Sequence, residues 1–361
     1  MEGVLFTLLA IVLFIVVLGG IVLMHELGHY LTARFFDVRV LEFGFGFPPR
    51  AKVLRSKGET LLTLNWLPIG GFVRMDGEDG DGEEDPRSFS AKPLRVRLAI
   101  LVAGVVMNVV LAFVIFFLIA WLATPTVGAK VGSVEAGSPA ATIGIVEGDE
   151  IYAINGSRVE MLGGSSVGDV LRSHAGETIT LSIRHPDGSE GQVQATLRPA
   201  AELSATRGAL GVRLAEQTYA YVGHDPVASV GIAASSVGRW GGLILSGLGD
   251  LVNGFVKDPT AQPPAAGPIG IAVTLADVLL GVGPIVLLFV AGVLSINLAV
   301  VNILPFPPLD GGRMAMLILK RLFGARVSLR AERLTYAVGF VFLLAFVFWI
   351  SGFDIANLGQ R

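Results

Sequence analysis

The sequence predicts a polytopic α-helical membrane protein with about four transmembrane helices, an inserted α+β domain and a cytoplasmic-side β-hairpin. Three observations predict this fold class. Of the 361 residues, 52% are hydrophobic and 16% are charged, whereas about a quarter are charged in soluble proteins; the mean hydropathy is +0.67. Four apolar runs are long enough to cross a bilayer. Between the second and third runs, alternating and β-branched segments separated by turn dipeptides replace the apolar pattern.

Composition also excludes several classes of protein. The hydrophobic fraction excludes a disordered chain. The absence of cysteine excludes a disulfide-stapled module, thiolate metal sites and a cysteine nucleophile. A formal net charge of −3 provides no strongly basic surface, so we expect no nucleic-acid partner.

The four apolar runs are residues 3–24, residues 98–124, a part of residues 278–309, and residues 334–353. The first covers about 33 Å as a helix. A signal peptide is the alternative interpretation of this run. It fits poorly because Glu2 stands where Lys or Arg is usual, the run is too long, and no small-residue cleavage site follows. We therefore expect a retained span.

Lys and Arg residues near the span ends predict the orientation, because cytoplasmic loops carry an excess of both. Residues 30–97 contain eleven of them, and residues 313–333 contain six. Both segments are therefore predicted to be cytoplasmic, with the N-terminus and residues 125–262 outside. The expected location is a bacterial inner (plasma) membrane, although an organelle of bacterial descent would show the same pattern.

Residues 125–200 predict a small α+β domain. Alternation and β-branching indicate strands at residues 131–134, 150–154, 178–184 and 191–198, and apolar residues indicate short helices at 140–143 and 167–173. Beyond this domain, residues 227–256 are apolar but interrupted by Arg239 and Asp250, so we expect an interfacial helix instead of a fifth span. The proline-rich residues 258–267 are expected to form a linker.

The pattern His25-Glu26-Leu27-Gly28-His29 stands at the cytoplasmic end of the first span. Residues four apart share one face of a helix, so His25 and His29 can offer both imidazoles to one metal ion while Glu26 holds a water molecule. A pair of hydrogen-bonded interfacial histidines is the alternative. Ionisable groups in membrane helices are energetically costly and usually functional, which favours a metal site over a hydrogen-bonded histidine pair.

A tetrahedral catalytic site needs a third protein ligand, and Asp310 is the candidate. The other histidines all lie in the outer region. If three successive spans run inward, outward and inward, Asp310 returns to the membrane level of His29. The alternative is that Asp310 caps the N-terminus of a helix expected at residues 314–322. The matching membrane depth of Asp310 and His29 favours Asp310 as the third metal ligand.

Together these motifs resemble those of the site-2 proteases, which are intramembrane zinc proteases, and among them the bacterial regulator-of-sigma-E type. The resemblance covers the His-Glu-x-x-His motif, the Asn-x-x-Pro-x-Pro-x-Leu-Asp-Gly-Gly segment from Asn302, residues 43–46 and 68–75 of the first loop, and Gly104 with Asn108 in the second span. One departure is Val105, where the family commonly has proline. It affects local helix shape and not the metal.

The resemblance implies a zinc-dependent intramembrane endopeptidase with one Zn²⁺ held by His25, His29 and Asp310. Zinc lowers the pKa of a coordinated water to about 7. Glu26 would take the proton of this water during attack and pass it to the leaving amine. The implied substrates are transmembrane segments of single-pass membrane proteins, such as an anti-sigma factor or a remnant signal peptide, cleaved by regulated intramembrane proteolysis.

A substrate helix must be unwound before cleavage, because its backbone groups are locked in internal hydrogen bonds. Residues 51–55 and 60–66 flank a turn-forming segment and predict a hairpin, whose edge strand could pair with an extended substrate. An ordinary surface hairpin is the alternative.

The resemblance also implies a set of substrate-binding residues. These are Asn302, Pro305, Gly70, Gly71 and Phe72. For Asn302, a hydrogen bond between two spans is the alternative.

Within the inserted domain, residues 137–141, 148–151 and 154–156 resemble bacterial PDZ domains, and some other small β-rich domain is the alternative. The resemblance implies that this domain binds peptide or protein termini, or excludes untrimmed substrates. The expected domains are a first part of the membrane core at 1–124 with its hairpin loop at 42–75, the PDZ-like domain at 125–200, the interfacial helix and linker at 201–267, and the second part of the core at 268–361.

Two other functions remain as alternatives. In a non-catalytic membrane adaptor, the metal would be structural and the PDZ-like domain would capture peptides. A metal transporter is less suitable, because no other ionisable residue lies inside a predicted span. The acidic residues 76–85 do not match the EF-hand spacing, so we expect a solvated loop there.

Overall fold

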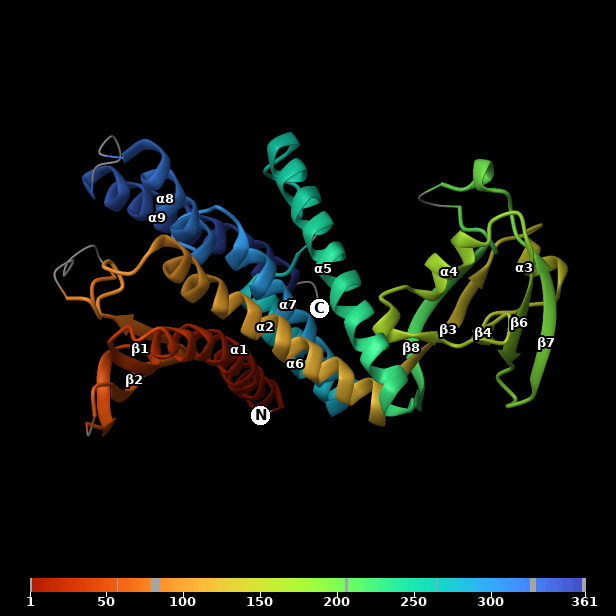
Figure 1. Ribbon diagram of the computed structural model, residues 1–361. Coiled ribbons are helices and arrows are strands. Elements are labelled where there is room, and N and C mark those ends of the chain that lie inside the picture. Colours follow the sequence, from red (N-terminus) through yellow and green to blue (C-terminus); the bar gives the residue numbers. More distant parts are fainter. Residues whose placement is uncertain are drawn as a thin grey trace. The chain divides into compact units, whose positions relative to one another are not determined.

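The computed structural model describes residues 2–56, 58–78, 85–204, 207–263, 265–324 and 329–358. The chain forms two compact units, each described here by itself. One unit combines Met1–Ile115 with Trp240–Arg361, and the other is Phe116–Arg239. The long apolar helices belong mainly to the first unit, and a six-stranded sheet belongs to the second (Figure 1).

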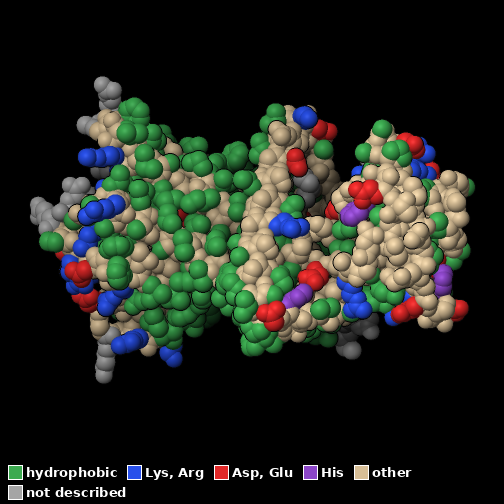
Figure 2. All heavy atoms as spheres, turned by 45° about the vertical axis from the view of Figure 1, so that its right-hand side comes forward, with side chains coloured by type: hydrophobic (Ala, Val, Ile, Leu, Met, Phe, Trp, Pro, Cys, Tyr) green, Lys and Arg blue, Asp and Glu red, His purple; other side chains and the backbone are tan. Residues whose placement is uncertain are grey.

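Four helices in the described part of the chain are long and apolar enough to cross a membrane. They are α1 (Glu2–Phe35), α2 (Leu94–Leu122), α7 (Pro284–Ile303) and α9 (Leu329–Leu358). Each contains or overlaps one predicted run, so the polytopic class is confirmed. Figure 2 shows hydrophobic side chains covering a broad area of the helical unit, with charged side chains gathered at one end of it. Lipid tails can cover such a surface without cost.

The third predicted span is divided in the structure. The run at 278–309 holds the end of a short helix, α6 (Pro268–Gly281), and all of α7. Gly283 separates them with φ of 115°, a conformation that suits glycine, and Pro284 then begins α7. The sequence prediction missed α6 because its apolar pattern continues into α7 without a polar residue.

Two further long helices are described. The segment in which we expected an interfacial helix is helical, as α5 (Pro226–Lys257), and its place at a membrane surface stays a prediction. The helix expected at 314–322 is α8, which begins earlier, at Asp310, and ends at Phe323. Both have apolar side chains on one face and polar side chains on the other, as helices at a membrane surface do.

The first loop forms a sheet that is larger than the predicted hairpin. Its strands are β1 (Val40–Arg55) and β2 (Leu61–Met75), and each bends into two paired segments. Residues 40–47 lie between residues 71–75 on one side and 61–67 on the other, and residues 50–55 form the far edge. The predicted hairpin is this outer part, and Lys57 of its turn lies outside the described residues. Residues 71–75 form the opposite, open edge.

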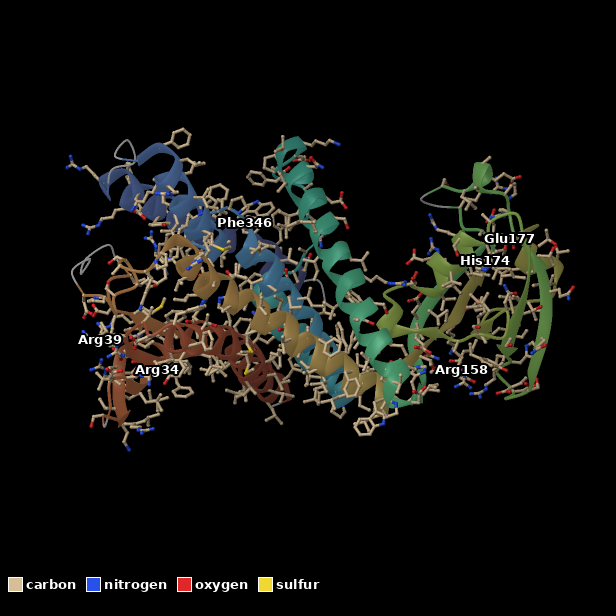
Figure 3. All side chains as sticks on the ribbon, viewed as in Figure 1. Arg34, Arg39, Arg158, His174, Glu177 and Phe346 are labelled. Carbon is tan, nitrogen blue, oxygen red and sulfur yellow. The ribbon has the colours of Figure 1, made fainter. Side chains whose placement is uncertain are left out.

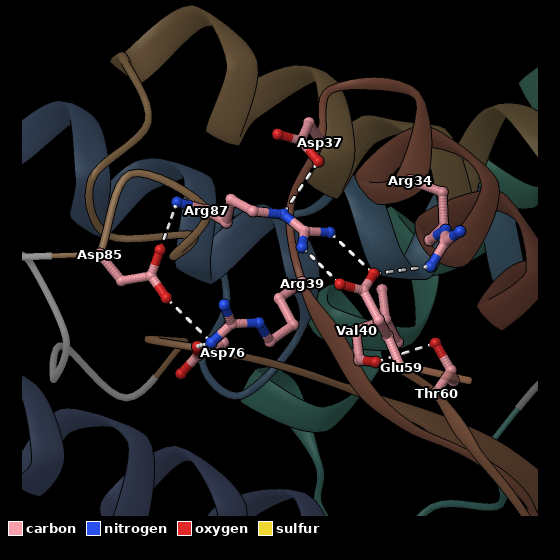
Figure 4. A network of polar contacts seen from close by, with 9 residues as sticks. All are labelled: Arg34, Asp37, Arg39, Val40, Glu59, Thr60, Asp76, Asp85 and Arg87. Atoms are coloured by element: carbon pink, nitrogen blue, oxygen red, sulfur yellow. Dashed lines mark hydrogen bonds and ion pairs between the residues drawn. The ribbon is translucent and has the colours of Figure 1, made fainter. Parts of the chain in front are cut away.

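Ion pairs join the segment that follows α1 to the turn of this sheet and to the loop that follows β2 (Figure 4). Arg87 pairs with Asp37 and Glu59, and Arg39 pairs with Asp76 at 3.2 Å and Asp85 at 2.9 Å. Arg39 lies beside Arg34 at the same end of the helical unit in Figure 3. Asp76 and Asp85, at the two ends of the acidic run, are thus ion-paired and partly exposed. Residues 79–84 lie outside the described residues, so the solvated loop stays a prediction.

The second unit contains a single antiparallel sheet of six strands that differ in length. Its strand order is β5-β3-β4-β6-β7, with β8 paired to β3. The strands are β3 (Thr124–Val134), β4 (Glu150–Ile154), β5 (Val159–Glu160), β6 (Thr178–Arg184), β7 (Glu190–Thr196) and β8 (Val212–Val222), and the helices are α3 (Pro139–Thr142) and α4 (Val167–Ser173). The four predicted strands and two predicted helices are confirmed. The inserted β domain is confirmed in this sense. The predicted domain end at residue 200 is too early, because β8 pairs with β3 along its whole length and extends the sheet to Val222.

Candidate metal centre

His25, Glu26 and His29 lie in the second half of α1. Their spacing places both imidazoles on the face that packs against α2, where His25 is 5% exposed and His29 6%. Gly28 allows this close approach, because a Cβ there would lie 2.4 Å from the carbonyl oxygen of Ala103. The histidines are thus held between two helices and away from water.

Asp310 completes a cluster with these histidines. Its Oδ2 lies 2.9 Å from Nε2 of His25 and 3.2 Å from Nε2 of His29, and the two Nε2 atoms are 3.1 Å apart. This is the one group of three or more potential metal-binding side chains found among the described residues.

The three donor atoms fit a zinc ion. A tetrahedral zinc with bonds of about 2.0–2.2 Å holds its ligand atoms about 3.3 Å apart, close to the separations observed. The donor set of two imidazoles and one carboxylate is a common one for catalytic zinc, and it leaves a fourth position open. Nδ1 of His29 lies 2.8 Å from the carbonyl oxygen of Ile100, so that ring nitrogen carries the proton and Nε2 is free to bind metal.

Tight packing of the chain brings Asp310 to the histidines. A Cβ on Gly311 would lie 2.2 Å from the carbonyl oxygen of Leu304, and one on Gly312 would lie 2.6 Å from that of Phe306. The start of α8 therefore presses against the segment that follows α7. The helix cap is Leu309, with no side-chain cap bond, and Asp310 is the first helical residue. The alternative in which Asp310 is the N-cap does not hold in the structure.

Glu26 lies between the cluster and the open edge of the sheet. Its Oε2 accepts a hydrogen bond from the backbone N–H of Val73 at 3.0 Å. A Cβ on Gly71 would lie 3.9 Å from Cγ of Glu26 and 2.7 Å from the carbonyl oxygen of Gly44. The Glu26 carboxylate therefore faces the edge segment 71–75, whose other side pairs with residues 40–47.

The predicted substrate-binding residues fall in two places. Gly70 and Gly71 run along α1, where a Cβ on Gly70 would lie 2.8 Å from Val22, and the Phe72 ring packs over Gly44. Asn302 is half-buried in the last turn of α7, and Pro305 is exposed in the segment leading to Asp310.

Sequence reasoning missed three polar groups of the site. These are the carbonyl of Ile100, the backbone N–H of Val73 and the amide of Asn108, which lies near His25. Two are backbone groups that no side-chain pattern marks. Asn108 was noted only as a matching residue, although a polar residue inside an apolar helix was itself a usable signal.

Comparison with known proteins agrees with this geometry. The model of peptidase family M50 matches residues 13–346 of the chain. Zinc metalloprotease RasP of Geobacillus kaustophilus is 28% identical, with 97% of this chain and 98% of that protein covered. A relative from Clostridium perfringens, named as a zinc metalloprotease, is 30% identical over 93% of this chain and 96% of its own length. One from Thermotoga maritima is 45% identical over 41% of this chain and 30% of its own.

Proposed function

The chain belongs to peptidase family M50, the site-2 protease family of zinc metalloproteases, and we propose that it cleaves the transmembrane segments of single-pass membrane proteins. It is a multi-pass protein of the bacterial inner-membrane kind, so its surroundings are a lipid bilayer. The observation that carries the proposal is the meeting of His25, His29 and Asp310 beside Glu26 and an open sheet edge.

In this proposal, His25, His29 and Asp310 hold the zinc ion and Glu26 is the general base. Zinc, when bound, polarises a carbonyl group and lowers the pKa of a water molecule to about 7. Glu26 accepts a proton from the attacking water and returns it to the nitrogen of the leaving amine. The Val73 N–H fixes the direction of the Glu26 carboxylate before reaction.

The edge segment 71–75 is the proposed place for the substrate backbone. An unwound transmembrane segment has free N–H and C=O groups, and a strand edge offers partners to both. The Val73 N–H points away from residues 40–47 and donates to Glu26, and the Met75 N–H donates to Glu78. A paired substrate would therefore have to take over these two donors from the carboxylates. An extended substrate paired here would pass beside Glu26.

Asn302 and Pro305 are proposed to hold the substrate from the opposite side. They precede Asp310 on the segment that joins α7 to α8. No hydrogen bond links the Asn302 amide to another residue in the ranges that the structure describes, so its donor and acceptor are available.

The inserted domain is proposed to be a PDZ-like domain that lies outside the membrane, as does the N-terminus, with the active site near the cytoplasmic face. PDZ domains bind extended peptides by strand addition. Glu216 of β8 accepts the N–H of Val167 at the start of α4. This bond places strand β8 beside helix α4, and a strand edge beside a helix could receive an extended peptide, which supports the PDZ-like assignment. Such a domain would bind peptide or protein termini, or exclude substrates whose outer part is untrimmed.

The test is cleavage of a purified single-pass substrate by the full chain in liposomes. Glu26→Gln should lower the cleavage rate about 10²–10⁴-fold, because a positioned general base contributes that factor. Its zinc content should remain that of the wild type. The matched control is Glu147→Gln, the same change at an exposed carboxylate of the inserted domain.

Cleavage by Glu26→Gln at the wild-type rate, with zinc present, would overturn the proposal. A wild-type chain that binds zinc and never cleaves, but captures peptides, would instead favour the membrane adaptor with a structural metal.

A further inference from the structure

One face of α2 lies directly under the two histidines. Ile100, Gly104 and Asn108 are four residues apart and so share that face. The carbonyl of Ile100 faces Nδ1 of His29 at 2.8 Å, and the amide of Asn108 faces Nδ1 of His25 at 3.5 Å. Between them, Gly104 leaves room for both rings. Each histidine thus has a polar partner on its outward nitrogen.

Asn108 has one polar atom without a partner. The residue is 0% exposed, and its Oδ1 is buried with no hydrogen bond in the described structure. A buried unpaired carbonyl is costly. The two ends of a carboxamide have nearly the same shape, so turning the amide by 180° brings Oδ1 to the position opposite His25 Nδ1.

The chemistry of the metal ligand requires that turned arrangement. If Nδ2 donated to Nδ1 of His25, the ring proton would be on Nε2, which is the atom that faces His29 and Asp310. A protonated Nε2 cannot bind a metal. If Oδ1 accepts instead, Nδ1 carries the proton and the Nε2 lone pair points into the cluster.

We infer that Asn108 is a positioning residue for the metal centre: its Oδ1 accepts the Nδ1–H of His25 and thereby fixes the tautomer and ring orientation of that ligand. The arrangement pairs the buried oxygen with a donor, and Nδ2 then takes the position that Oδ1 has in the structure. It makes α2 the support for both histidines, through a backbone carbonyl at Ile100 and a side chain at Asn108. This inference rests on the proposed zinc site but not on the proposed substrate or cleavage.

The backbone of Asn108 also contacts α7. Ser295, which is fully buried, donates through Oγ to the backbone carbonyl of Asn108 at 2.8 Å. Three helices therefore meet at this residue: α1 through His25, α2, and α7. Removing the Ser295 hydroxyl disturbs the same helix contact without touching the side chain that faces His25, so Ser295→Ala is a matched control.

The experiment measures zinc affinity of the detergent-purified full chain by competition with a chelator, with no substrate present. Asn108→Leu, which keeps the volume but removes the acceptor, should bind zinc about 10–100-fold more weakly, the usual cost of losing such a partner. Asn108→Asp, which keeps an acceptor, should retain affinity within a few fold of the wild type. Ser295→Ala should stay near the wild type.

A spectroscopic measurement separates positioning from general destabilisation. In cobalt-substituted protein, the visible absorption bands report ligand geometry, and Asn108→Leu should shift them while Asn108→Asp and Ser295→Ala do not. Zinc affinity of Asn108→Leu within twofold of the wild type would overturn the inference, as would an equal loss in Asn108→Leu and Asn108→Asp. Because no substrate is used, failure of the proposed cleavage would leave this result unaffected.

Discussion

Gly104 sets the distance between α2 and the metal centre. A Cβ at this position would lie 2.5 Å from Nε2 of His29 and 2.7 Å from Cε1 of His25, closer than atoms can approach. Both imidazoles are buried and held by neighbouring groups, so neither can move aside. The small size of residue 104 is therefore part of the proposed zinc site, as are the side chains of the proposed ligands.

Gly104→Ala is accordingly expected to weaken zinc binding at least tenfold and to lower cleavage in parallel. The added methyl group displaces the ring nitrogens from a common point. The measurement is chelator competition together with the cleavage rate, and Gly20→Ala on α1 is the control, because a Cβ there meets nothing within 4 Å. Wild-type affinity in Gly104→Ala would show that the rings are not held as described.

At the scale of elements, the edge segment 71–75 links the sheet to α1. Gly71 is close to Glu26, and the Val73 N–H holds the Glu26 carboxylate. The same edge would receive the substrate under the proposed function. Backbone hydrogen bonding at Val73 thus matters more than its side chain.

Val73→Pro, which removes the N–H, should lower cleavage at least tenfold while zinc content stays near that of the wild type. Val73→Thr keeps the N–H and nearly the same shape, so it should cleave at close to the wild-type rate. The comparison of the two cleavage rates is the measurement. Equal cleavage rates in the two variants would contradict a role for the Val73 N–H in cleavage.

The sheet is also tied together by one buried carboxylate. Glu42, 4% exposed, accepts hydrogen bonds from Arg50 at 2.7 Å and from Thr63 at 2.8 Å, and it pairs with Arg74. Burial acts to raise the pKa of Glu42, but the bonds from Arg50 and Thr63 and the nearby positive charges lower it overall. The group therefore stabilises the folded state when it is ionised.

This depressed pKa gives the stability a definite pH dependence. The contribution is complete above the unfolded-state pKa of about 4.3 and is lost as the pH falls from there through the lower folded-state pKa. At pH 7, Glu42→Gln should lower the free energy of unfolding by about 1–3 kcal/mol. The difference from the wild type, followed by thermal unfolding in detergent, should shrink below about pH 4. A difference that is constant with pH would contradict this assignment.

At the scale of the whole molecule, the sequence predicted the elements better than their packing. The four apolar helices follow from run length, and the strands around β4 and β6 follow from alternation. The chain was expected to bring Asp310 to the membrane level of His29. In the structure, Oδ2 of Asp310 and Nε2 of His29 lie 3.2 Å apart.

What could not be predicted depends on rotation and bending. Helix α2 is apolar on all sides, so no periodicity shows that Asn108 faces His25 and not lipid. The bends that fold β1 and β2 into four segments lie at residues 48–49 and 68–70, inside stretches that otherwise look like single strands. Gly46 stands just before the first bend and Gly70 in the second, with φ of 77° and 72°. The break at Gly283 divided a run that composition alone makes continuous.

The most direct test of the central claim is the zinc content of the purified full chain. His25 and Asp310 are 285 positions apart in sequence, yet both must contribute to one ion. The account predicts about one zinc per chain in the wild type and in the exposed-site control Asp187→Ala, and almost none in His25→Ala or Asp310→Ala. A folded wild type without zinc, or full zinc content in Asp310→Ala, would contradict it.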